Sequence, residues 1–184
     1  MKIAVACVDG AVALNNKIVS VLTQEGHEVK DFGTYTTESC DYPDYVSAAA
    51  RSVASGEYER GIVLCTTGIG VSIAANKIPG IRCALLSDVL SARLTRQHND
   101  TNMMAMGGGI IGENLALEIM ETWLHTEFSG DERHVRRIAK LMALEKLTFS
   151  KGGCCAATAP EFFRFFPCLK PLYSCRGGVF GFPI

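Results

Sequence analysis

The chain has 184 residues, a length typical of one domain. Its 18 Lys and Arg residues against 19 Asp and Glu residues give a net charge of -1, which excludes a strongly basic surface for nucleic acid or anionic lipid. Hydrophobic residues make up 48% of the chain, which excludes a wholly disordered protein, and no apolar run reaches the ~18 residues of a membrane-spanning helix. The first residues resemble a strand more than a signal peptide. We therefore expect a cytoplasmic protein that binds neither nucleic acid nor membranes.

The apolar pattern predicts alternating strands and helices. In chain order these are strand 2–7, helix 12–25, strand 27–32, a polar loop 33–44, helix 45–55, strand 61–65, helix 71–77, strand 81–86, helix 88–98, strand 102–106, helix 114–126 and helix 132–146. Gly26 is typical of a helix C-cap, and Ser87 or Asp88 of an N-cap. This alternation predicts a doubly wound, Rossmann-like α/β fold: a parallel five-stranded sheet with helices on both faces.

Residues 151–184 have a different composition. They hold seven aromatic residues, four Cys, four Pro and five Gly with no steady period. The tail cysteines lack the Cys-x-x-Cys spacing of a zinc site, and we expect the cysteines of the first 150 residues to be reduced thiols. The sequence thus predicts one domain over 1–150 and an appended tail over 151–184.

The strongest local signal is Cys65-Thr66-Thr67-Gly68-Ile69-Gly70, between a buried strand and a helix. Ligands of such folds bind beyond the carboxyl ends of the strands, where Cys7, Cys65 and the turn at Gly107 are all expected. Backbone amides of the turn can point at an anionic oxygen, helped by the helix dipole. Cys65 is either a base or nucleophile favoured as a thiolate there, or a small core residue beside a tight turn. The turn lacks the third glycine of a dinucleotide fingerprint and the lysine of a P-loop.

Other candidates are ordinary residue types in suggestive positions. Arg133 and Arg137 lie four residues apart at the start of the last helix, a spacing that suits either bidentate phosphate binding or a solvated basic face. His98 precedes Asn99 in a polar loop, where it could transfer protons or be a plain surface histidine. Tyr42 is either a binding hydroxyl or a packed turn residue.

Together these residues resemble the family of ribose-5-phosphate isomerase B and the galactose-6-phosphate isomerase subunits. The resemblance spans about residues 1–146 and includes the opening Arg133-His134 of the last helix. Its longest stretches are Asp31-Phe32-Gly33-Thr34-Tyr35, Asp41-Tyr42-Pro43-Asp44-Tyr45, Gly68-Ile69-Gly70-Val71-Ser72-Ile73-Ala74-Ala75-Asn76-Lys77 and His98-Asn99-Asp100.

The resemblance implies an isomerase that interconverts ribose 5-phosphate and ribulose 5-phosphate through an enediolate. It implies that Cys65 is the base, with Thr67 beside it, and that His98 assists ring opening. The implied substrate contacts are Tyr42, Asn99, the amides of Gly68, Ile69 and Gly70 at the oxyanion, and Arg133 and Arg137 at the phosphate. It implies no metal or organic cofactor, and a homodimer or dimer of dimers whose sites combine residues of two chains.

Three positions depart from the family pattern. Val8-Asp9-Gly10-Ala11 stands where the family reads Asp-His-x-Gly, so that Asp9 would substitute by a shift of one residue. Gly109 replaces a basic residue, and Thr66 replaces a glycine and is expected to crowd the pocket. Losing one charged phosphate partner costs about 1–3 kcal/mol. These departures keep two alternatives open: a hexose-6-phosphate isomerase of the galactose or allose type, and a non-catalytic sugar-phosphate binding protein.

Overall fold

Five short apolar segments form one parallel sheet. In the computed structural model, which describes residues 1–146, the strand order is β2-β1-β3-β5-β4. The strands are β1 (Lys2–Cys7), β2 (Glu28–Asp31), β3 (Arg60–Cys65), β4 (Cys83–Leu85) and β5 (Met103–Gly107). The central strands β1, β3 and β5 are almost wholly buried, as expected of a parallel sheet covered on both faces.

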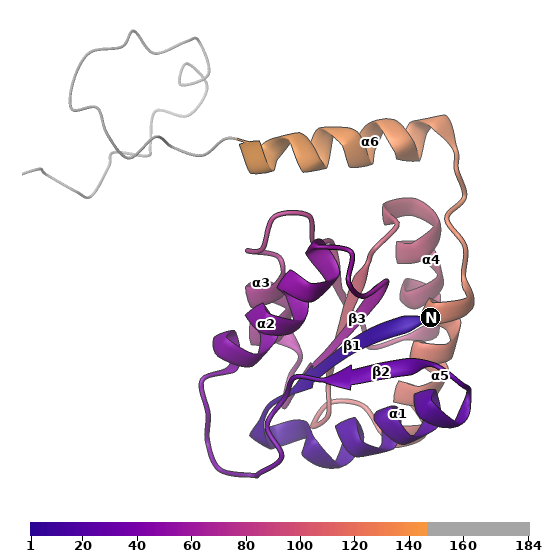
Figure 1. Cartoon of the computed structure of the whole chain (residues 1–184). Helices are drawn as coiled ribbons and strands as arrows, with labels where there is room; N and C mark the ends of the chain where they lie inside the picture. Colours follow the sequence, from indigo (N-terminus) through magenta and orange to yellow (C-terminus); the bar gives the residue numbers. More distant parts are fainter. Residues whose placement is uncertain (147–184) are drawn as a thin grey trace, which may run out of the picture. The chain divides into compact units, whose positions relative to one another are not determined.

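Helices cover both faces of this sheet (Figure 1). They are α1 (Val12–Gln24), α2 (Tyr42–Ala54), α3 (Ile69–Ala75), α4 (Val89–Asn99), α5 (Glu113–His125) and α6 (Glu132–Ala143), with short 3-10 turns η1 (Asp9–Ala11) and η2 (Leu144–Lys146). One core joins α1, α4 and α5 to the sheet, and the other joins α2 and α3 to its opposite face. This arrangement confirms the predicted doubly wound fold. Among residues 1–146, no helix combines the length and apolar character needed to cross a bilayer.

Most predicted elements lie within a few residues of their observed bounds, and one boundary was wrong. Helix α2 begins at Tyr42, inside the predicted loop 33–44. Pro43 lies in the first helical turn, where its fixed φ favours the helix and its missing N–H costs nothing. The N-cap of α4 is Asp88, whose Oδ1 accepts a hydrogen bond from the Ser91 N–H at 2.7 Å.

The last helix lies apart from the two layers. An extended segment follows α5, and α6 then passes the end of α4 (Figure 1). At its far end, Glu145 accepts hydrogen bonds from the Gly80 N–H at 3.0 and 3.1 Å. Gly80 precedes β4, so α6 lies along the amino-terminal edge of the sheet. The predicted tail 151–184 falls outside the described residues.

Candidate active site

The turn after β3 holds the sulfur of Cys65 in place. Cys65 is the last residue of β3 and is half-buried, and the Gly68 N–H donates a hydrogen bond to its Sγ at 3.0 Å. A donor aimed at sulfur stabilises negative charge there. Cys65 also packs against the core formed with α2 and α3, so the feature that distinguishes a reactive thiol here is the N–H donor at its sulfur.

Gly68 makes this turn possible. Its φ is +78°, and a β-carbon on it would lie 2.5 Å from Leu85 Cδ1 and 2.8 Å from the backbone carbon of Met106. No other residue type fits both the conformation and the space. The next amide, Ile69 N–H, donates to Thr67 Oγ1 at 3.3 Å. The N–H groups of Gly68 and Ile69, two of the three amides expected to face an oxyanion, therefore form hydrogen bonds within the turn. The third, Gly70 N–H, lies in the first turn of α3, where the helix backbone offers no acceptor to its N–H groups.

Tyr42 and Asp9 border the same carboxyl-terminal edge. Tyr42 packs over Gly70, where an added β-carbon would lie 3.1 Å from its Cζ. Asp9 begins η1 after β1, and the Cys40 thiol lies 3.9 Å from its Oδ1, the long end of a thiol hydrogen bond. The structure thus gathers Cys65, Thr67, Gly70, Tyr42 and Asp9 at one edge, the edge where the sequence predicted Cys65 to lie.

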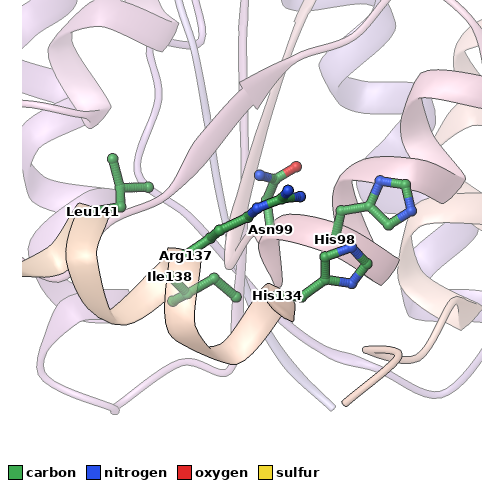
Figure 2. Close-up of a pocket in the computed structure, with 6 residues that line it drawn as sticks. All are labelled: His98, Asn99, His134, Arg137, Ile138 and Leu141. Carbon is green, nitrogen blue, oxygen red and sulfur yellow. The ribbon is translucent and has the colours of Figure 1, made fainter. Parts of the chain in front are cut away.

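A second group forms a pocket between α4 and α6 (Figure 2). The pocket encloses about 250 Å³ and is lined by His98, Asn99, His134, Arg137, Ile138 and Leu141. Arg137 extends from α6 toward Asn99 (Figure 2), so an amide and a guanidinium share the pocket. These groups suit a phosphate and its neighbouring hydroxyls. Arg133 does not line the pocket; its guanidinium is exposed and lies 3.4 Å from Asp131.

His134 packs against His98 in this pocket. The ring centroids are 4.5 Å apart, and Ser129 Oγ lies 2.8 Å from His134 Nδ1. Loss of hydration lowers the pKa of His134, and the charges of His98 and Arg133 lower it further. A neutral His134 therefore lies against His98 near neutral pH.

The two groups lie at opposite edges of the sheet. Cys65 ends β3 at the carboxyl edge, whereas α4 starts beyond β4 and returns to the amino edge, where His98 and Asn99 precede β5. A strand of six residues is ~16–20 Å long. A single chain therefore brings Cys65 to Thr67 and Tyr42, and His98 to Arg137, but does not bring Cys65 to His98.

Sequence reasoning gave no role to three residues of the pocket: His134, Ile138 and Leu141. Together with Arg137 they follow the spacing i, i+3, i+4, i+7, which places all four residues on one face of a helix. This spacing could have identified them from the sequence. Among residues 1–146, no three His, Cys, Asp or Glu side chains come close enough to hold a metal ion.

Comparisons with known proteins identify the family of this chain. The Ribose/Galactose Isomerase family matches residues 3–141. Ribose-5-phosphate isomerase B of Escherichia coli is 45% identical over 79% of this chain and 97% of that protein. Galactose-6-phosphate isomerase subunit LacB of Clostridium acetobutylicum is 40% identical over 81% of this chain and 88% of that protein. The structure of Clostridium thermocellum ribose-5-phosphate isomerase B superimposes with a TM-score of 0.78 at 48% identity, over 79% of this chain and 98% of that one. The chain belongs to the ribose/galactose isomerase family.

Proposed function

We propose that this protein is an aldose-ketose isomerase that interconverts ribose 5-phosphate and ribulose 5-phosphate. The observation that carries the proposal is the Cys65 sulfur, held by the Gly68 N–H beside Thr67 at the carboxyl edge of the sheet. Relatives named as ribose-5-phosphate isomerase B support the choice of substrate.

In the proposed reaction, the Cys65 thiolate removes the proton from C2 of the open-chain aldose. The electron pair forms the C1–C2 double bond of an enediolate, and the C1 oxygen takes the negative charge. The proton of the C2 hydroxyl passes to the C1 oxygen and the thiol returns its proton to C1, which gives the ketose with no atom gained or lost. Gly70 N–H and the Thr67 hydroxyl are the proposed donors to the oxygens that gain charge. His98 would assist ring opening, and Asn99 and Arg137 would hold the hydroxyls and phosphate, with Arg133 at the rim.

The proposed site requires two chains. Cys65 and His98 lie at opposite edges of one chain, so each site would take Cys65 from one copy and His98 from its partner. Large apolar side chains near the carboxyl edge support a homodimer, because Ile69, Ile73, Leu90 and Ile110 are all more than half exposed. The proposed setting is the cytoplasm, which keeps Cys65 reduced.

Incubation of the purified protein with ribose 5-phosphate, followed by detection of ribulose 5-phosphate, tests the proposal. Cys65→Ala should abolish turnover while calorimetry still detects sugar-phosphate binding. Cys83→Ala is the matched control, since it removes a thiol at the opposite end of the sheet. Near-normal turnover in Cys65→Ala would show that another group is the base.

A hexose 6-phosphate is the second candidate substrate. It is motivated by the loop at Asp9 and by Gly109, two places next to the proposed sugar site where this chain departs from the family pattern. Turnover on a hexose 6-phosphate and not on ribose 5-phosphate would select it. Binding with no turnover on either sugar would indicate a non-catalytic sugar-phosphate binding protein.

We also propose that residues 1–150 form the isomerase domain and 151–184 an appendage. The whole sheet, both helix layers and every proposed site residue lie within 1–146. Removal of 151–184 should leave turnover unchanged, and a large loss of activity or solubility would contradict this assignment.

A further inference from the structure

The side chain of Thr66 fills a gap between two loops next to Cys65. One loop is η1, which contains Gly10, and the other is the turn after β5, which contains Gly109. A β-carbon added to Gly10 would overlap Thr66 Oγ1 and lie 3.1 Å from Thr66 Cβ. A β-carbon added to Gly109 would lie 3.0 Å from Thr66 Cγ2. Thr66 therefore occupies the space that side chains at both positions would need.

Backbone conformation does not explain these two glycines. The described glycines with positive φ are Gly26, Gly56, Gly68, Gly80 and Gly130, and neither Gly10 nor Gly109 is among them. The three atoms nearest to each added β-carbon all belong to Thr66. At Gly10 the side chain of Thr66 excludes a β-carbon, and at Gly109 a β-carbon would be crowded by both Thr66 Cγ2 and the Thr66 carbonyl oxygen, at 3.0 and 3.1 Å.

The backbone fixes Thr66 beside the proposed base. Gly109 N–H donates to the Thr66 carbonyl at 2.9 Å, and Gly108 N–H donates to the Cys65 carbonyl at 2.8 Å. Thr66 is nevertheless exposed, so its side chain borders open space at the edge where Cys65 and Thr67 lie.

We propose that Thr66 is a specificity-determining residue that limits the length of the sugar accepted beside Cys65. This inference rests on the proposed isomerase function. Replacement by glycine removes Cβ, Oγ1 and Cγ2 from between Gly10 and Gly109, which have no side chains to fill the gap. The three atoms removed outnumber the carbon and oxygen of one additional CH–OH group, the difference between a pentose and a hexose phosphate.

The test compares kcat/KM for ribose 5-phosphate and for allose 6-phosphate. The quantity compared is the ratio of kcat/KM for ribose 5-phosphate to kcat/KM for allose 6-phosphate. Thr66→Gly should lower this ratio about tenfold, which is the usual effect of one carbon unit in a fitted pocket. Thr66→Val keeps the shape and loses the hydroxyl, so it should keep the ratio of the unmodified protein. Thr66→Ser loses only the methyl group that faces Gly109, and should shift the ratio in the same direction by less; it also serves if Thr66→Gly fails to fold.

A second substitution tests whether volume is the cause. Gly10→Ala alone should lower the melting temperature, because the new methyl group overlaps Thr66. Gly10→Ala combined with Thr66→Gly refills the gap from the side of η1 and should restore both stability and the preference for ribose 5-phosphate. An unchanged ratio in Thr66→Gly, with the unmodified protein active, would overturn the inference and leave the isomerase function standing. No turnover of either sugar by the unmodified protein would overturn the proposed function, and this inference with it.

Discussion

The guanidinium of Arg96 donates a hydrogen bond to the carboxylate of Asp100 at 2.7 Å, across one turn at the end of α4. Arg96 is buried and also donates to the Thr101 and Thr126 carbonyls. Asp100 has a left-handed φ of 45°. This pair therefore fixes the chain reversal that directly follows His98 and Asn99.

We predict that Asp100→Ala lowers the free energy of unfolding by about 2–3 kcal/mol, because buried Arg96 loses its carboxylate and alanine is disfavoured at positive φ. Asp100→Asn should cost only about 1 kcal/mol, since asparagine tolerates that φ and keeps an acceptor oxygen. Urea unfolding measures both values. In conditions where both variants are folded, turnover should fall further in Asp100→Ala, because His98 and Asn99 are less well positioned. Equal stabilities of the two variants would refute the proposed role of the pair.

The order of elements and the carboxyl-edge location of Cys65 could be predicted because both follow from local patterns: apolar periodicity and a glycine turn between a strand and a helix. The packing of Thr66 between Gly10 and Gly109 could not, since it depends on side-chain volume between loops distant in sequence. The pairing of His134 with His98 depends on where the segment after α5 directs α6, which no local pattern encodes.

The described thiols should react at different rates. Burial, helped by the charge of Asp31, raises the pKa of Cys7 to about 12, and burial raises the pKa of Cys83 to about 12. Both remain protonated at neutral pH, whereas Cys65 is half-buried with an N–H aimed at its sulfur. Brief treatment with iodoacetamide should alkylate Cys65 well before Cys7 or Cys83, as measured by peptide mass spectrometry. Ribose 5-phosphate should slow labelling of Cys65 and leave labelling of Cys7 and Cys83 unchanged. Equal rates at Cys65, Cys7 and Cys83 would contradict this description of the turn.

Acid should weaken the packing of α6 on α4. Desolvation first, and then the charge of His98, lower the pKa of His134 below its ordinary value of 6.5. The unfolded chain keeps the ordinary value, so between the two pKa values it binds more protons than the folded chain, and stability falls as the pH drops through that window. NMR should place the His134 titration midpoint below 6.5, and His134→Gln should reduce the loss of stability below that pH. A midpoint at or above 6.5 would contradict the burial of a neutral ring.

Two inactive variants should restore activity when mixed. Cys65 and His98 lie at opposite edges of the sheet, so a site that uses both must take them from different chains. Cys65→Ala and His98→Ala should each have little turnover alone. In a mixed dimer, one site holds both substitutions and the other holds neither. Random exchange of subunits should therefore restore about a quarter of the unmodified activity.

His98→Ala mixed with a Cys65→Ala, His98→Ala double variant is the control and should stay inactive. Failure of the first mixture, with subunit exchange verified by native mass spectrometry, would show that the chemistry does not join Cys65 to His98 across an interface.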